Sequence, residues 1–289
     1  MASIHELSIQ RLRPSIGYPC LDTFGNCRNF IFEKEVDAKR RNEKPLQDKK
    51  VFLASFIVLG FVMKIVAEFV HEVCGHGLFV LLFGGEITRV YISVLWPYEL
   101  SYTRWSLPSS ITSTQMAWIY VGGILACLCV SFLIQVFLIL RKKSSWYFAL
   151  TLFWLAFWTL INSTGYLIIG GLTPFGDIHE LIGLGVLWAF LSLALGIVVF
   201  VAGFVALSWI LRGIFAGEFS LKKASSGVIL FWLVIPMLGA VMLASPERGF
   251  QVAYLPLMFI PSLLSFVIEY FLVLSKQEAY ANPDNIAEE

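Results

Sequence analysis

Long apolar runs separated by short polar connections make up most of this chain. A helix that spans a bilayer needs about 20 predominantly apolar residues, and six runs are long enough. They cover residues 51–83, 115–140, 146–172, 180–211, 226–244 and 251–274. The pattern predicts an all-α polytopic membrane protein with about six transmembrane helices.

Residues 84–114, which follow the first run, have a different pattern. The segment begins with two glycines, is rich in β-branched and aromatic residues, and then reaches a Trp-Pro pair at 96–97. β-Branched and aromatic residues favour strands, and Pro ends them. We therefore expect a short β-strand or hairpin at the membrane face.

The two ends of the chain are polar. Residues 1–50 mix ten basic with seven acidic residues and contain no apolar run, a composition without enough apolar surface for a core of its own. The expected organisation is an N-terminal tail over 1–50, a transmembrane domain over 51–275 and a C-terminal tail over 276–289.

Composition agrees with a membrane protein. Hydrophobic residues make up 58% of the 289 positions and charged residues 14%, whereas soluble domains have roughly 45–50% and about 25%. The formal net charge of +1 provides no general field that would attract nucleic acid. We expect the lipid bilayer as partner and no nucleic acid.

Basic residues fall almost entirely on one side of the predicted spans. Seventeen lie in the N-terminal tail, in every second connection and in the C-terminal tail, against three on the other side, Arg89, Arg104 and Arg248. Because cytoplasmic loops carry the excess of Lys and Arg, both termini are expected in the cytoplasm.

The first apolar run contains the sequence HEVCGH at 71–76, preceded by Glu68. An acidic side chain at mid-bilayer costs on the order of 2.5–3.5 kcal/mol, so these groups need compensation. A bound cation with buried polar partners would provide it.

The spacing of the two histidines differs from the familiar HExxH pattern, in which the histidines lie at i and i+4 and bind one zinc ion. His71 and His76 are five residues apart, roughly 140° around a regular α-helix. A one-residue π-bulge near Gly75 would bring them together. A stripe of Glu68, Glu72 and His76 on a regular helix, or a polar patch without a metal, are the alternatives.

A second polar cluster follows the third run and contains Asn162, Asp177, His179 and Glu180. A catalytic zinc site has a third protein ligand and an open position. Asp177 is the preferred third ligand, with His179, Glu180 and Glu68 as alternatives. Asp177 with Glu180 also fits a helix N-cap with a capping box.

These features together resemble the site-2 protease family of intramembrane zinc metalloproteases. The resemblance covers about 71–185 and includes HEVCGH, the segment GGEITRVYIS at 84–93, VGGILA at 121–126, and Asn162 followed by Pro174 and Asp177. It implies peptide-bond hydrolysis of membrane-protein substrates with Zn2+ as cofactor. The implied zinc ligands are His71, His76 and Asp177, the general base is Glu72, and the implied substrate-binding residues are Val90, Tyr91, Ile92 and Asn162.

Two other function classes remain open. One is a non-catalytic transporter or scaffold with a degenerate metal site. The other is an iron-dependent membrane oxidoreductase, suggested by the Glu68-x-x-His71 spacing. The charge distribution puts both polar clusters in the half of the bilayer away from the cytoplasm, whereas in the resembled family the metal lies nearer the cytosol.

Overall fold

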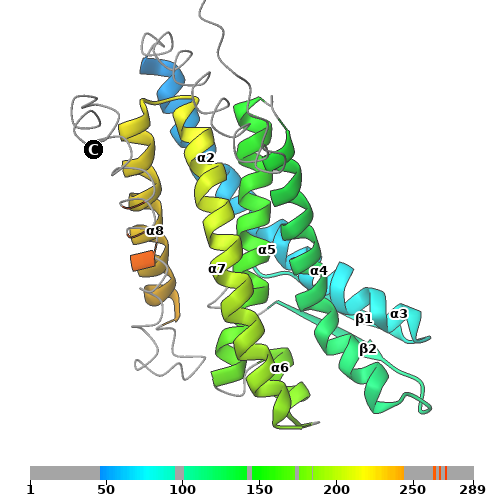
Figure 1. The fold of residues 1–289 in the computed structure, drawn as a ribbon. Helices are drawn as coiled ribbons and strands as arrows, with labels where there is room; N and C mark the ends of the chain where they lie inside the picture. Colours follow the sequence, from blue (N-terminus) through cyan, green and yellow to red (C-terminus); the bar gives the residue numbers. More distant parts are fainter. Residues whose placement is uncertain are drawn as a thin grey trace, which may run out of the picture.

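The computed structural model describes residues 46–94, 101–141, 145–172, 176–183 and 185–243, together with 263, 264, 267 and 271. Most of these residues are helical (Figure 1). Four helices are long and apolar enough to cross a membrane, and they cover Lys49–Leu82, Ser113–Leu140, Trp146–Leu172 and Leu187–Ala216. Four long apolar helices indicate a membrane-embedded protein.

The first three of these helices agree with the predicted runs, and the fourth differs. Instead of one helix over 180–211, the structure has a short helix α6 (Gly176–Gly183) and then a long helix α7 (Leu187–Ala216). Gly183 and Gly185 flank the break, and glycine interrupts helices because of its conformational freedom. The predicted boundary was therefore wrong at both ends.

The remaining predicted segments are covered only in part. The fifth run, 226–244, coincides with most of α8 (Leu221–Leu243), whose described apolar stretch is shorter, Lys223–Val234. Helix α2 (Leu46–Phe69) begins inside the predicted N-terminal tail, because polar residues extend it before the apolar run. The rest of both tails, and all but four residues of the sixth run, lie outside the described residues.

A single helical rod carries the first polar cluster. It consists of α2, the π-helix η1 (Val70–Gly77) and the short helix α3 (Leu78–Leu82), which follow one another without interruption. Gly84, with a φ of 77°, then turns the chain back, a backbone conformation that favours glycine.

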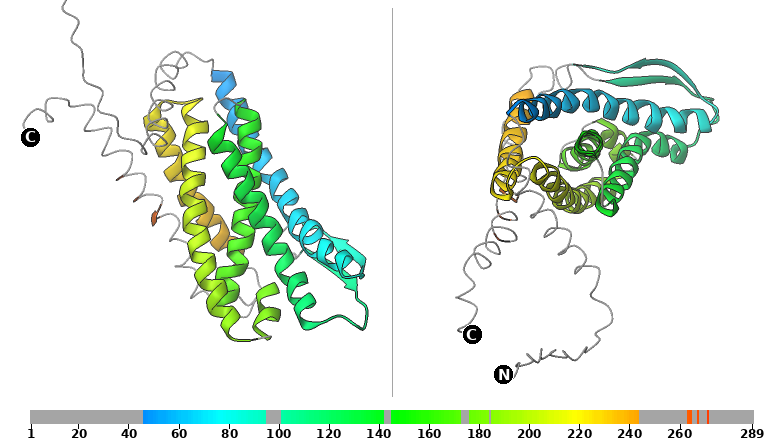
Figure 2. Two further views of the ribbon diagram at one scale, coloured as in Figure 1. Left: turned by 45° about the vertical axis from the view of Figure 1, so that its right-hand side comes forward. Right: turned by 90° about the horizontal axis from the view of Figure 1, so that it is seen from above.

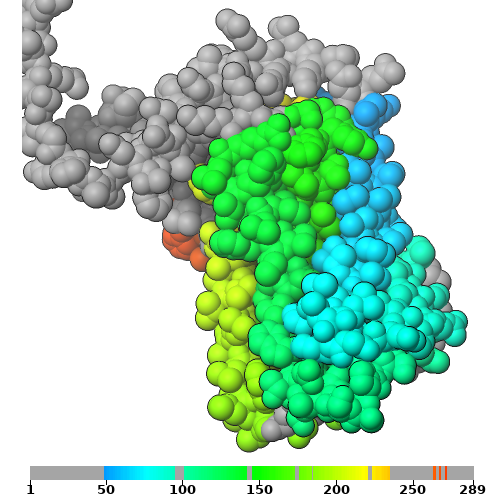
Figure 3. All heavy atoms as spheres, turned by 90° about the vertical axis from the view of Figure 1, so that its right-hand side faces the viewer, coloured from blue at the N-terminus to red at the C-terminus, as the bar shows by residue number. Residues whose placement is uncertain are grey.

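The predicted hairpin is confirmed. Strands β1 (Glu86–Tyr91) and β2 (Tyr102–Ser106) pair antiparallel, with Ile87 opposite Trp105 and Tyr91 opposite Tyr102. The hairpin runs along the outer side of the helical rod (Figure 2). Figure 3 shows α3, the hairpin and the first turns of α4 (Ser113–Leu140) gathered at one end of the molecule.

Helix α5 (Trp146–Leu172) is the central helix of the bundle, surrounded by α2, α4 and α7 (Figure 2). In its most apolar window 56% of the residues are buried, against 22–33% in the other three spans. The main core gathers large aromatic side chains around the first half of α5, including Phe52, Trp154, Phe204 and Trp232. The histidine motif and Asp177 lie toward the opposite end of the bundle, away from the main core.

Candidate metal centre

The π-helical turn η1 brings His71 and His76 together. In a π-helix the backbone bonds join residues i and i+5, so residues five apart lie above one another. The Nε2 atoms of His71 and His76 are 3.2 Å apart. The predicted π-bulge is confirmed, and it extends over the eight residues Val70–Gly77. The alternative stripe requires a regular α-helix, which this segment does not form.

Glycines allow η1 to approach α4 closely at this point. A Cβ atom on Gly75 would lie 2.3 Å from Gly123 Cα and 2.8 Å from the Gly122 carbonyl oxygen. A Cβ atom on Gly123 would lie 2.7 Å from Nε2 of both histidines. The pair Gly122-Gly123, within the predicted VGGILA segment, therefore forms the backbone surface on which the histidines rest.

Helix α6 brings Asp177 to the two histidines. Asp177 Oδ2 lies 3.2 Å from His71 Nε2 and 3.4 Å from His76 Nε2. The helix begins at Gly176, so Asp177 is in its first turn, and its carboxylate points to the histidines; the N-cap interpretation is not supported. Gly176 has a φ of 52°, and a Cβ there would lie 2.4 Å from the Tyr166 ring.

A small apolar cluster anchors α6 in this position. Ile178 and Leu181, on the buried face of α6, pack against Ile124 of α4 and Leu167 of α5. Gly170 of α5 leaves room for this contact, because a Cβ atom there would lie 2.5 Å from Ile178 Cβ. Tertiary packing therefore positions Asp177, 106 residues after His71.

The three ligand atoms form a nearly equilateral triangle with edges of 3.2, 3.2 and 3.4 Å. Tetrahedral zinc with ligands at 2.0–2.1 Å keeps its ligand atoms about 3.3 Å apart. In the part of the chain that the structure describes, this is the one group of three His, Cys, Asp or Glu side chains with such convergence. The donor set and its spacing fit a tetrahedral ion with one position left open.

The outer nitrogen of His76 supports this interpretation. His76 Nδ1 lies 2.7 Å from the Ile119 carbonyl oxygen, to which only a protonated nitrogen can donate. Nε2 of the neutral ring then presents a lone pair toward the Nε2 atom of His71 and the Asp177 carboxylate. Lone pairs that converge in this way need a cation or a proton between them, and metal-bound histidines commonly make such an outer hydrogen bond.

His71 has different surroundings. Its Nδ1 atom lies 3.9 Å from the thiol sulfur of Cys127, and its ring stacks on Tyr166 with centroids 4.8 Å apart. His76 lies near the Trp105 ring, at 6.0 Å between centroids. No sequence pattern indicated Cys127, Tyr166 or Trp105, because they come from three elements that only the fold brings together.

Glu72, the predicted general base, is buried beside the cluster. The exposed fractions of His71, Glu72 and His76 are 1%, 5% and 3%. The Glu72 carboxyl group is close enough to both histidines and to Asp177 to interact with their charges. Its backbone carbonyl accepts a hydrogen bond of 3.2 Å from the Thr103 hydroxyl of β2.

The charge environment keeps Asp177 ionised. Burial alone would raise the pKa of the Asp177 carboxyl group. When a proton lies between these groups, the positive charge that it gives His76, together with hydrogen bonds with His71 and His76, brings this pKa below its ordinary value. A carboxylate, unlike a carboxylic acid, can ligate a cation through either oxygen. Asp177 is therefore in the protonation state that a metal ligand needs.

The alternative third ligands lie elsewhere. His179 and Glu180 are exposed on α6 and do not join the cluster. Glu68 is buried one turn before His71, where its Oε1 accepts a hydrogen bond of 3.3 Å from Asn162 Nδ2. Asn162, predicted to bind substrate, thus contacts Glu68, a neighbour of the histidine motif.

The other predicted substrate-binding residues lie at the end of β1. Val90 and Tyr91 are in the strand, and Ile92 follows directly after it. Val90 is exposed, while Tyr91 is half-buried with its ring 5.5 Å from the Tyr102 ring. Beyond the strand, Ser93 is held by a hydrogen bond of 3.3 Å from the buried Lys64 Nζ to its carbonyl oxygen.

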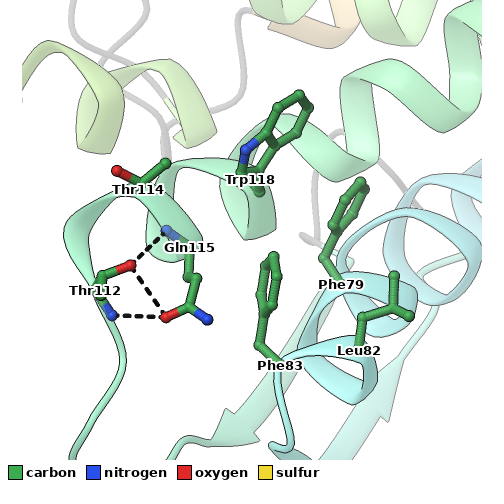
Figure 4. Close-up of a pocket in the computed structure, with 7 residues that line it drawn as sticks. All are labelled: Phe79, Leu82, Phe83, Thr112, Thr114, Gln115 and Trp118. Atoms are coloured by element: carbon green, nitrogen blue, oxygen red, sulfur yellow. Dashed lines mark hydrogen bonds between the residues drawn. The ribbon is translucent and has the colours of Figure 1, made fainter.

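A shallow apolar groove opens between α3 and the beginning of α4 (Figure 4). Thr112 and Gln115 form a capping box at its edge, with the Thr112 amide donating to Gln115 Oε1 at 2.9 Å. The lining residues are Phe79, Leu82, Phe83, Thr112, Thr114, Gln115 and Trp118. None of them is titratable, so the groove has no groups for acid-base or metal chemistry.

Comparison of the chain with protein-family models, with curated protein sequences and with solved structures gave no match.

Proposed function

We propose that this chain is an intramembrane zinc metalloprotease of the site-2 protease type. The observation that carries the proposal is the triangle of His71, His76 and Asp177 ligand atoms, with edges of 3.2–3.4 Å, beside the buried Glu72. Two histidines, one carboxylate and an adjacent glutamate are the groups that metal-assisted peptide hydrolysis requires.

The roles of the residues follow from their positions. His71, His76 and Asp177 would hold the ion, and the Ile119 carbonyl orients His76. A zinc ion bound there would supply Lewis-acid chemistry and would lower the pKa of its bound water to about 7. Glu72 accepts the proton from the attacking water and delivers it to the leaving amine. The burial of these side chains limits the access of bulk water and strengthens their electrostatic interactions.

The proposed substrate is a membrane-spanning or membrane-associated polypeptide. A helical substrate must unwind before its backbone can be attacked, and an exposed strand can receive the unwound segment by β-augmentation. Strand β2 contacts η1 through Thr103 and Trp105, so the hairpin lies beside the proposed metal ligands. Val90, Tyr91 and Ile92 at the end of β1 are the proposed contacts for the substrate.

An iron-dependent oxidoreductase is the second candidate, because two histidines with one carboxylate also form the usual Fe(II) triad. Hydrolysis is favoured over oxidation by the buried Glu72, for which an oxygenase of this kind has no role. The identity of the bound metal separates the two.

The first experiment measures the metal content of the detergent-purified full-length protein by elemental analysis. We expect about one zinc per chain in the wild type, and loss of zinc in His71→Ala, His76→Ala and Asp177→Ala. His179→Ala is the matched control, because His179 lies two residues from Asp177 but is exposed, and it should keep the zinc. Iron in place of zinc would favour the oxidoreductase, and wild-type protein without metal would overturn the proposal.

Glu72→Gln tests hydrolysis separately from metal binding. Because Glu72 is not a ligand in this proposal, the variant should retain zinc, and its cleavage of fluorescently labelled unfolded β-casein should fall by 100-fold or more, the order of a lost general base. Unchanged cleavage by Glu72→Gln would exclude Glu72 as the base. Cleavage absent from a zinc-loaded wild type would favour a scaffold or transporter.

A further inference from the structure

Strand β2 presents two side chains to the π-turn. Thr103 and Trp105 are two residues apart, so they lie on the same face of the strand. Thr103 donates its hydroxyl hydrogen to the Glu72 carbonyl oxygen at 3.2 Å, and both residues are buried. The Trp105 ring lies beside the ring of His76.

The Glu72 carbonyl is one of the backbone acceptors in η1 whose partner differs between an α-helix and a π-helix. In an α-helix this oxygen accepts from the amide of His76, four residues on, and in a π-helix from the amide of Gly77, five residues on. The choice determines whether His76 aligns with His71. A carbonyl oxygen has two lone pairs, so the Thr103 hydroxyl can bond to it from outside the helix.

A hydroxyl that bonds a helix carbonyl from outside tilts that carbonyl away from the helix axis. Tilting moves the Glu72 carbonyl oxygen away from the amide of His76, its partner in an α-helix. This weakens the α-helical hydrogen bond and favours the wider π-turn. A second hairpin contact acts on the same turn, because Ile87 Cδ1 would lie 2.9 Å from a Cβ atom on Gly77. Hairpin contacts therefore reach Glu72, His76 and Gly77.

We propose that the hairpin holds the π-turn in register, and that Thr103 is a positioning residue for the metal ligands. The proposal rests on the proposed metal site and adds a function for β2 beyond receiving substrate. Thr103 touches neither the ion nor the substrate in this scheme, and it acts through the Glu72 carbonyl on the position of His76.

The test compares Thr103→Val, Thr103→Ser and Thr159→Val in the full-length protein. Thr103→Val keeps the shape and removes the hydroxyl, and Thr103→Ser restores the hydroxyl. Thr159→Val is the matched control, because Thr159 is also buried and donates to a backbone carbonyl, that of Leu155, at 2.7 Å. The readouts are the zinc Kd by chelator competition and the absorption spectrum of the Co2+-loaded protein.

We expect Thr103→Val to bind zinc about 10- to 100-fold more weakly, the usual effect of losing an outer partner of a metal site, with an altered Co2+ spectrum. Thr103→Ser should restore both, and Thr159→Val should leave both unchanged. Wild-type affinity and spectrum in Thr103→Val would overturn the proposal. An equal loss in Thr103→Val and Thr159→Val would also overturn it, since it would reflect general stability.

Hydrogen exchange in chelator-treated protein gives a readout that is independent of the metal. Thr103→Val should speed exchange of a peptide spanning 70–77 relative to wild type and Thr159→Val, because the turn then changes register more easily. If the wild type binds no metal but exchange responds in this way, the proposed function fails and the positioning role stands. Unchanged exchange overturns the positioning role.

Discussion

At the scale of single residues, the candidate site depends on Gly123, which has no side chain, as much as on the ligands. Gly123 lies against Nε2 of both histidines, closer than any Cβ atom could lie without displacing them. The ligand nitrogens therefore face the backbone of α4 directly. A position of this kind tolerates glycine alone, although its backbone is helical.

Gly123→Ala is expected to abolish zinc binding. The new methyl group would lie 2.6 Å from His71 Cε1 and 2.7 Å from both Nε2 atoms, so both rings must move. Elemental analysis of the purified variant checks this. Gly213→Ala on α7 is the control, because a Cβ atom there meets nothing within 4 Å; it should keep its zinc. A Gly123→Ala protein with full zinc content would contradict the geometry of the site.

At the scale of elements, η1 behaves as one residue inserted into a helix. Both flanking segments, α2 and α3, are α-helical and continue the same rod. A local insertion of this kind is absorbed by the π-turn, so the helices before and after keep their directions. Cys74 is the exposed residue of this turn between the two histidines.

Deletion of Cys74 is expected to convert HEVCGH into HEVGH, with the histidines at i and i+4 of an ordinary α-helix. That spacing also binds one zinc ion, so the deletion variant should retain zinc, within about tenfold of the wild-type Kd. Its affinity should not respond to Thr103→Val, because no π-turn remains to be held.

Deletion of Phe61, an exposed residue of α2, is the control for this experiment. It rotates the preceding part of α2 by about 100° relative to the histidines and should disrupt the bundle. If deletion of Cys74 leaves a folded protein without zinc, the π-turn itself is required for the site.

At the scale of the whole molecule, the main hydrophobic core and the candidate metal ligands lie in different parts of the bundle. The aromatic core lies around the first half of α5, while the ligands lie toward the other end, where α6 and the hairpin meet the bundle. Buried charges are costly in an apolar environment, and this arrangement keeps His71, His76 and Asp177 away from the main core. The site can therefore be altered without removing the packing that holds α2, α5 and α7 together.

The orientation in the membrane is predicted by the charge distribution. Reporter domains fused to Met1 and Glu289 should both report the cytoplasmic side. Seventeen basic residues lie on the side of the predicted spans that holds both termini, and cytoplasmic segments carry the excess of Lys and Arg. Fusion after Ile111, in the connection before α4, should report the opposite side. A C-terminal reporter on the side opposite to the N-terminal one would require an odd number of spans.

The apolar pattern alone determined that the protein is helical and membrane-embedded, because burial in lipid demands long apolar helices. The spacing of His71 and His76 favoured a π-turn, because residues five apart on an α-helix cannot share one ion, but it left the stripe of Glu68, Glu72 and His76 open. Glycines and β-branched residues after the first span were sufficient to predict β-structure there, as a single strand or a hairpin. These are local relations, and local sequence encodes them.

Only the tertiary structure decided which residues meet at the site. The sequence favoured Asp177 as third ligand but left His179 and Glu180 as alternatives. The packing of Ile178 and Leu181 against α4 and α5 directs Asp177 alone to the histidines. The contact of Thr103 with Glu72 joins residues 31 positions apart. Such contacts depend on how whole helices and strands pack against one another, and local patterns of hydrophobic and polar residues do not predict that packing.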